Sequence, residues 1–223
     1  MMEVKLTQAV KMFFGNSSLE MVFFEAIANS LDAEATEINI EISAKAYTRP
    51  ETLAIKLIDN GIGFTDERYR KFSKLFDVDE SSHKGLGRLV YLCYFENVKI
   101  SSYFENLHYR EFEFNENFDS KKVQINTVQP TQSGTTILMN NYHKSTIWKY
   151  EFVQPKYLKN RILEEFYPRL FQLKTQGKDI VINITSIIDG TEQKSTITKD
   201  DIPKFNFVEL KDSVSLYDKF DLH

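Results

Sequence analysis

The sequence is poor in cysteine, proline and glycine. Among its 223 residues there are one cysteine, five prolines and eight glycines. The single cysteine, Cys93, cannot form an internal disulfide, which excludes disulfide-stapled secreted domains and predicts a reducing, cytoplasmic setting. The low glycine and proline content excludes collagen-like and low-complexity chains.

The sequence also lacks long apolar runs and a strong charge of either sign. No run approaches the roughly 20 apolar residues that a membrane-spanning helix needs, so no membrane partner is expected. Charges at Glu3, Lys5 and Lys11 interrupt the first fifteen residues, which therefore resemble neither a signal peptide nor a span. The net charge of −4 argues against broad electrostatic binding to nucleic acid.

Aromatic residues, in contrast, are abundant. The chain has 18 phenylalanines and 11 tyrosines, and each such side chain buries a large area, so a sizeable core is expected. The length suits one large domain, or one domain with part of a second.

Hydrophobic spacing predicts a series of alternating elements in the first two thirds of the chain. Ser17 and Glu20 form a capping-box pattern before a helical apolar stripe. Period-two alternation then predicts strands, and Thr65 followed by two acids predicts another helix start. The expected strands are 38–42, 53–57, 98–101, 109–114, 123–127 and 135–139, with a further helix at 88–95. This order predicts an α+β fold, a two-layer sandwich with helices on one face of a mixed, mostly antiparallel sheet.

The pattern changes after about residue 142. Residues 157–173 have a helical apolar stripe, residues 179–185 resemble a strand, and Asp189-Gly190 is typical of a turn. We expect one domain over residues 1–142 and a C-terminal extension over residues 143–223 that begins a second domain.

Three polar residues share one face of the first helix. Glu25 and Asn29 are four residues apart and Asp32 follows three later, so their side chains lie along one stripe. The stripe could present two carboxylates and an amide to one ligand, or it could be the solvated face of an amphipathic helix. Asp32 lies near the helix C-terminus, where a negative charge meets the unfavourable end of the helix dipole and needs a partner.

The segment Asp59-Asn60-Gly61-Ile62-Gly63 follows a predicted strand. Asn60-Gly61 alone would be typical of a hairpin turn, but a helix start, rather than a returning strand, comes next. Glycines let a backbone approach a planar ligand closely. An ionised Asp59 could accept a hydrogen bond from an exocyclic amine, such as that of adenine.

Two further segments could bind phosphate or support the site. Lys84-Gly85-Leu86-Gly87-Arg88 lies at a predicted loop-to-helix junction, where free N–H groups and two cations suit phosphate. A short Gly-x-Gly also marks ordinary loops. Ser133-Gly134-Thr135 opens a predicted strand and means little by itself.

Taken together, these four segments resemble the motifs of the GHKL ATPases, the family of gyrase, heat-shock chaperones, histidine kinases and MutL. The matching residues are Glu25-xxx-Asn29-Ser30-x-Asp32-Ala33, Asp59-x-Gly61-x-Gly63, Gly85-Leu86-Gly87 and Gly134-Thr135. The resemblance covers about residues 15–140 and implies the Bergerat ATP-binding fold, with ATP between helices and sheet.

The resemblance also implies roles for single residues. Asn29 is similar to the amide that coordinates Mg²⁺, and Asp59 to the aspartate that recognises adenine. Gly61 and Gly63 correspond to the glycines beside the base, and Thr135 to the threonine that supports the aspartate.

Glu25 resembles the glutamate that orients or deprotonates the attacking water, which histidine kinases lack. Lys84, Gly85, Leu86, Gly87 and Arg88 resemble an ATP lid, although this motif is shorter than the fuller Gly-xx-Gly-x-Gly form. Asp32 is expected to act behind these residues, near the lid or Asp59.

The expected function is therefore Mg-dependent binding and slow hydrolysis of ATP, with ATP as a gate for a conformational clamp. The alternative is an ATP- or ADP-sensing module with little turnover. The resemblance implies a homodimer on ATP binding and leaves open whether the clamp acts on DNA or on a client protein. In the ATPase branch a lysine of a following transducer domain contacts the γ-phosphate, and residues 143–223 are too few for that whole domain.

Overall fold

A single mixed sheet organises the chain in the computed structural model, which describes residues 10, 14–73, 86–145, 147 and 149–202. The strands follow the order β5-β4-β3-β6-β2-β1-β7-β8. All neighbouring pairs are antiparallel except β1 and β7, which run parallel. The strands are β1 (Glu37–Ala44), β2 (Ala54–Asp59), β3 (Phe95–Phe104), β4 (His108–Phe114), β5 (Ile125–Thr127), β6 (Gly134–Tyr142), β7 (Val181–Ile188) and β8 (Thr191–Ile197).

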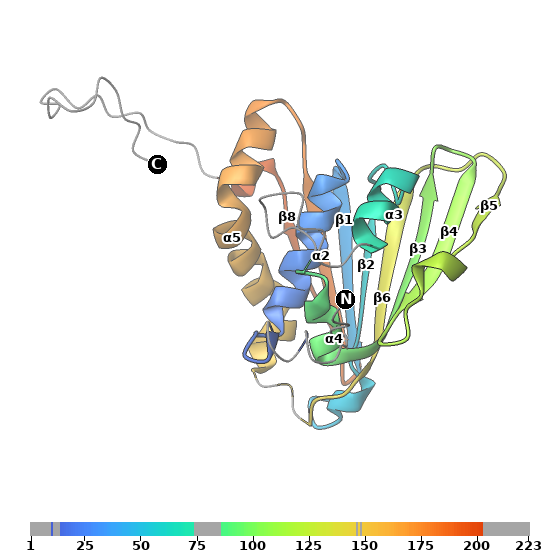
Figure 1. Cartoon of the computed structure of the whole chain (residues 1–223). Helices are drawn as coiled ribbons and strands as arrows, with labels where there is room; N and C mark the ends of the chain where they lie inside the picture. Colours follow the sequence, from blue (N-terminus) through green and yellow to red (C-terminus); the bar gives the residue numbers. More distant parts are fainter. Residues whose placement is uncertain (1–9, 11–13, 74–85, 146, 148, 203–223) are drawn as a thin grey trace, which may run out of the picture.

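Helices cover one face of this sheet. Figure 1 shows α2, α4 and α5 on one side of the strands, with α3 near α2. Helix α3 packs on Phe112 and Phe114 of β4. The α-helices of the described residues are α2 (Glu20–Asp32), α3 (Asp66–Ser73), α4 (Leu89–Tyr94) and α5 (Pro155–Thr175). The predicted α+β sandwich is thus confirmed, including its mixed and mostly antiparallel sheet.

The alternation of the strands explains the two faces. In β1, Ile38, Ile40 and Ile42 point to the helices and are at most 1% exposed, whereas Glu37 and Glu41 are exposed on the other face. Successive side chains of a strand point to opposite faces, so a period-two pattern buries one set of residues.

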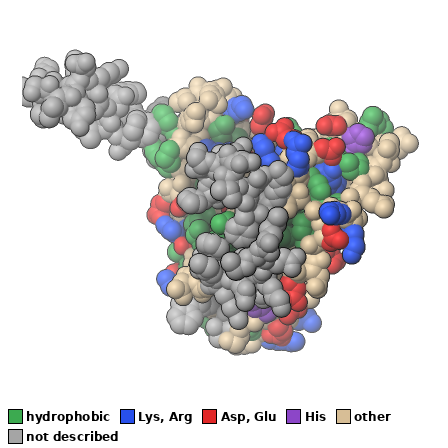
Figure 2. Space-filling view, viewed as in Figure 1, with side chains coloured by type: hydrophobic (Ala, Val, Ile, Leu, Met, Phe, Trp, Pro, Cys, Tyr) green, Lys and Arg blue, Asp and Glu red, His purple; other side chains and the backbone are tan. Residues whose placement is uncertain are grey.

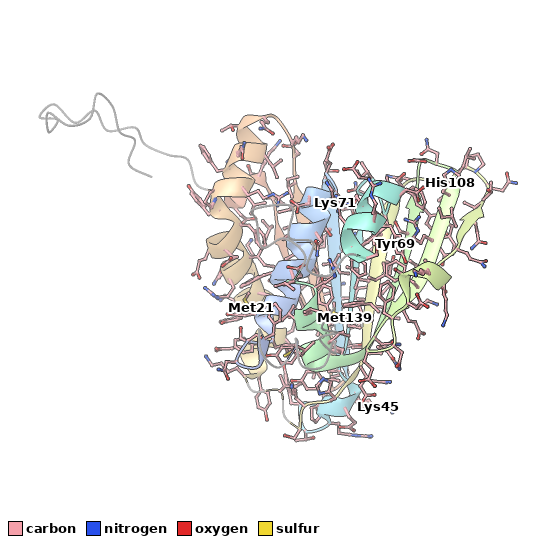
Figure 3. The ribbon with its side chains drawn as sticks, in the orientation of Figure 1. Met21, Lys45, Tyr69, Lys71, His108 and Met139 are labelled. Atoms are coloured by element: carbon pink, nitrogen blue, oxygen red, sulfur yellow. The ribbon has the colours of Figure 1, made fainter. Side chains whose placement is uncertain are left out.

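Tyr69 of α3, labelled in Figure 3, packs edge-on against Phe112 of β4 with ring centroids 5.4 Å apart.

The start of α2 differs from the predicted capping box. Helix α2 begins at Glu20, and no side chain caps it. The Ser17 hydroxyl instead donates to the carbonyl of Phe14 at 2.8 Å. Glu20 accepts hydrogen bonds from Tyr157 and Arg161 of α5, because α5 packs close enough to outcompete a local cap.

The C-terminal part of the described chain is built into the same sheet. Strand β7 pairs with β1 along its whole length, from Glu37↔Val181 to Ala44↔Ile188. Leu158 of α5 belongs to the same hydrophobic core as Ile27 and Ile38. The extension that we expected to begin a second domain at residue 143 therefore completes the first sheet and its core as far as residue 202.

Candidate functional site

A cavity of about 780 Å³ opens between the helices and the sheet. Such a volume lies within the range of small-molecule sites. The polar and charged side chains on its walls include Glu25, Asn29, Asp32, Asp59, Arg68, Arg88, Tyr91 and Thr135. Residues far apart in the sequence, from α2, β2, α3, α4 and β6, thus meet at one place.

Asp59 borders this cavity where β2 meets Ser30 of α2, a place called the Asp59 end below, and is 7% exposed. Its Oδ2 accepts a hydrogen bond from the Ser30 hydroxyl at 3.0 Å, and its Oδ1 accepts one from the Gly61 N–H at 2.9 Å. Burial raises the pKa of Asp59, while the Gly61 N–H, the Ser30 hydroxyl, the Thr135 N–H and the charge of Arg68 oppose that rise. The carboxylate is therefore fixed in position, with several donors supporting its ionised form.

The two glycines after Asp59 are required by the packing of the chain on itself. Gly63 has φ of 77°, and a Cβ there would lie 2.2 Å from the carbonyl oxygen of Tyr103. A Cβ at Gly61 would lie 2.6 Å from the carbonyl oxygen of Ala33. Only glycine fits at these contacts, and they hold the loop after β2 against the end of α2 and against β3. Neither glycine lines the cavity itself, whereas Ile62 and Phe64 of the same loop do.

Thr135 faces Asp59 across the β2–β6 pair. Its Oγ1 lies 3.2 Å from the Oγ of Ser102, a buried residue that the sequence motifs did not indicate. Ser102 Oγ also accepts from the N–H of Phe64 at 2.8 Å. Thr135 thus supports the Asp59 region through its own backbone N–H and through a hydroxyl pair that anchors the loop after β2.

Glu25 and Asn29, one turn apart on α2, border the same cavity, at a place called the Glu25 end below. The Asn29 amide nitrogen donates to Glu25 Oε1 at 3.0 Å. Burial raises the pKa of Glu25, and the Asn29 hydrogen bond and the charge of Arg88 act in the opposite direction. A Cβ at Gly87 would lie 2.0 Å from Glu25 Oε2, so the backbone before α4 rests directly against this carboxylate.

Arg88 is a buried cation beside Glu25. It is 5% exposed, and its guanidinium carbon lies 4.6 Å from the centroid of the Phe72 ring, a cation–π geometry. Burial lowers its pKa to about 10, with Glu25 acting to raise it. The side chain is thus still charged near pH 7, and it brings a positive charge to the Glu25 end of the cavity.

The C-terminus of α2 has two basic partners that the sequence motifs did not indicate. Arg68 donates to the carbonyl of Asp32 at 2.8 Å and to that of Asn29 at 3.1 Å. The Asp32 carboxylate pairs with Arg169 of α5 at 2.8 Å. Helix C-termini carry unpaired carbonyls and a partial negative charge. Arg68 and Arg169 therefore stabilise the end of α2, and Arg169 is the partner that Asp32 was expected to need.

Only part of the predicted phosphate-binding segment can be placed. Lys84 and Gly85 lie outside the described residues. Leu86 and Gly87 lead into α4, accepting hydrogen bonds at their carbonyls from the N–H groups of Leu89 and Val90.

The described residues offer few groups for a metal ion. Among them, no group of three or more histidine, cysteine or acidic side chains could hold one. The Asn29 amide and the neighbouring carboxylates of α2 are oxygen donors on the cavity wall. Mg²⁺ prefers oxygen, keeps several waters and is often shared with substrate phosphates, so one or two protein oxygens fit it.

Comparison with known proteins agrees with this arrangement. Residues 17–147 match the family described as "Histidine kinase-, DNA gyrase B-, and HSP90-like ATPase". The chain belongs to this family. ATP binding is the property that this ATPase family shares, and the GHKL resemblance of the four sequence motifs is thereby confirmed.

Similar folds occur among solved structures. The ATP-binding domain of Francisella tularensis topoisomerase IV, in complex with a small-molecule inhibitor, is 18% identical, with a TM-score of 0.54 over 85% of this chain and 92% of that one. The N-terminal domain of a DNA repair protein is 15% identical, with a TM-score of 0.49 over 88% of this chain and 56% of that one. The chain therefore spans little more than half of the latter structure.

Two further comparisons were negative. No curated protein is significantly similar to the chain. Within the described ranges of the chain, no helix is long and apolar enough to cross a membrane. Figure 2 shows acidic and basic side chains interspersed on the visible surface.

Proposed function

We propose that this domain binds ATP with Mg²⁺ in the cavity and hydrolyses it slowly. One observation carries the proposal: Asp59 and the Glu25–Asn29 pair, which are far apart in the sequence, border the same cavity. A fixed carboxylate suits an adenine amine at one end, and a carboxylate, an amide and a cation suit a triphosphate at the other.

Each residue then has a defined task. Asp59 accepts a hydrogen bond from the exocyclic amine of adenine. Asn29 supplies an oxygen to Mg²⁺, which would neutralise phosphate charge when bound. Glu25 orients the attacking water and accepts its proton, and Arg88 balances negative charge beside it. Phosphoryl transfer depends mainly on such positioning and charge stabilisation.

The order of these elements also supports a gating role. Gly87 lies against Glu25, so binding of a triphosphate there would favour a different position of Gly87 and Arg88, which belong to the predicted lid. A ligand that prefers one arrangement shifts the population toward it. We propose that this shift drives a clamp that closes as a homodimer, acting on DNA or a client protein, in the cytoplasm that the single cysteine predicts.

A second candidate function is an ATP or ADP sensor with little turnover. The close contact of Gly87 with Glu25 favours it, because in this arrangement the carboxylate is covered by backbone on one side. A sensor would not need Glu25 as a base, and substitution of that residue separates the two functions.

We expect Glu25→Gln and Glu25→Ala to retain ATP binding and to lower turnover roughly 10²–10⁴-fold, the usual contribution of a general base. Phosphate release and calorimetric ATP binding would be measured on the same preparations. Glu20→Gln is the matched control, since Glu20 lies on the same helix but binds Tyr157 and Arg161 of α5. Unchanged turnover in Glu25→Gln would contradict the assigned base. ATP binding without turnover in the wild type would favour the sensor.

A further inference from the structure

The hydroxyl of Tyr91 is buried beside the residues assigned to the phosphate end of the cavity. Tyr91 lies in α4 and is 1% exposed. Its oxygen is 3.4 Å from the amide nitrogen of Asn29, a residue 62 positions earlier in the chain. Buried phenol groups are normally placed where they have a hydrogen-bonding partner, and here that partner is the residue assigned to Mg²⁺.

The hydrogen bonds of the Asn29 amide determine which of its atoms is left for a ligand. The amide nitrogen carries two hydrogens, and the carbonyl oxygen is its only acceptor. The nitrogen donates to Glu25 Oε1 at 3.0 Å and to the Tyr91 hydroxyl at 3.4 Å. With both hydrogens directed at protein acceptors, the carbonyl oxygen is the remaining hydrogen-bonding atom.

The orientation of this amide matters for metal binding. Mg²⁺ takes oxygen ligands, whereas an amide turned by 180° would present its N–H groups and repel a cation. An asparagine amide is nearly symmetric in shape, so its hydrogen-bond partners select the orientation. The ionised Glu25 carboxylate can only accept, so it selects the orientation that turns the amide nitrogen toward it. The Tyr91 hydroxyl accepts the second hydrogen and restrains the amide in that orientation.

We propose that Tyr91 is a positioning residue, which holds the Asn29 amide with its oxygen directed to Mg²⁺. This inference rests on the proposed Mg-ATP site. Tyr91 also connects that site to α4, the helix that directly follows the Gly85-Leu86-Gly87 motif. Docking of α4 on α2 is then part of forming the metal site, because α4 supplies the second acceptor.

The test must separate positioning from packing. The Tyr91 ring is a core side chain, so removing it would destabilise the fold whatever the hydroxyl does. Tyr91→Phe keeps the ring and removes only the hydroxyl. Tyr94→Phe is the matched control: Tyr94 lies one turn later on the same helix, and its hydroxyl donates to the carbonyl of Ser17.

ATP binding would be titrated calorimetrically at increasing Mg²⁺ and also with the metal removed by chelation. We expect Tyr91→Phe to need roughly three- to ten-fold more Mg²⁺ for the same gain in ATP affinity, the scale of one lost supporting hydrogen bond. Its affinity for metal-free ATP should match the wild type, and Tyr94→Phe should match the wild type throughout.

Three results would overturn the inference. An unchanged Mg²⁺ requirement in Tyr91→Phe would show that the hydroxyl does not position the metal ligand. An equal loss of ATP affinity with and without Mg²⁺ would assign Tyr91 to packing alone. If wild type and Asn29→Ala were both indifferent to Mg²⁺, the proposed metal site itself would fail and the role of Tyr91 would fall with it.

Discussion

The two ends of the cavity are built in different ways. At the Asp59 end, both carboxylate oxygens accept hydrogen bonds from a strand-end loop and from α2, at 2.9 and 3.0 Å. At the Glu25 end, one amide nitrogen at 3.0 Å is joined by the charge of Arg88 and the backbone of Gly87. The first end is anchored in the sheet, and the second depends on how α4 and the segment before it meet α2.

In the proposed function, this difference assigns nucleotide recognition to the Asp59 end and the reaction with water to the Glu25 end. A carboxylate fixed by the sheet keeps its position whether or not a triphosphate is present, so it should treat ATP and ADP alike. Groups held by helix contacts can respond to the γ-phosphate, because elements with few fixed contacts are the ones that move when a ligand binds. Substitutions at the two ends should therefore have distinguishable consequences.

The largest effect expected on binding comes from the Asp59 end. Asp59→Asn should weaken ATP and ADP equally, by about 1.5–3 kcal/mol, the usual cost of losing a hydrogen bond to a charged group. Calorimetry with both nucleotides measures this. Asp189→Asn in the β7–β8 turn is a control, because asparagine tolerates the positive φ of 53° found there. A loss confined to ATP would contradict the division between the two ends.

A smaller effect concerns pH and the Glu25 end. Glu25 must be ionised to accept a proton, and burial raises its pKa above the ordinary 4.5. Turnover should thus fall as the pH drops through this raised value. Arg88 opposes the rise, so Arg88→Ala should move the acid limb of the turnover profile to higher pH.

Arg88→Lys tests the same point with the charge retained. It should leave the acid limb nearer to its wild-type position than Arg88→Ala does, whatever its absolute turnover. The measurement is phosphate release from Mg-ATP at a series of pH values. An acid limb that is the same in all three proteins would show that Arg88 does not influence the ionisation of Glu25.

Local patterns were sufficient to predict most of the fold. Period-two alternation identified β1 and β2, and the Asp189-Gly190 turn has the two positive φ values, 53° and 73°, of a tight hairpin. The same patterns could not show that β7 pairs in parallel with β1, because that pairing joins segments about 144 residues apart. The expected domain boundary depended on a change of pattern, which marks a new element rather than a new core.

The candidate site shows a similar division. Glu25, Asn29 and Asp59 belong to motifs with short, fixed spacings, which indicate a site from the amino-acid sequence alone. Arg68, Tyr91, Ser102 and Arg169 reach it through contacts that have no local spacing, such as the pair of Asp32 with Arg169. Lone arginines, tyrosines and serines occur throughout any chain, so only the folded arrangement distinguishes those that support a site.

The central claim is that one cavity joins adenine recognition to a Mg²⁺-dependent phosphate site. It is tested most directly by calorimetric titration of the wild-type chain with ATP and GTP, each with and without Mg²⁺. The account predicts saturable ATP binding that is strengthened by Mg²⁺, loses that strengthening in Asn29→Ala, and is much weaker for GTP. No binding at millimolar ATP, or equal affinity for ATP and GTP, would contradict it.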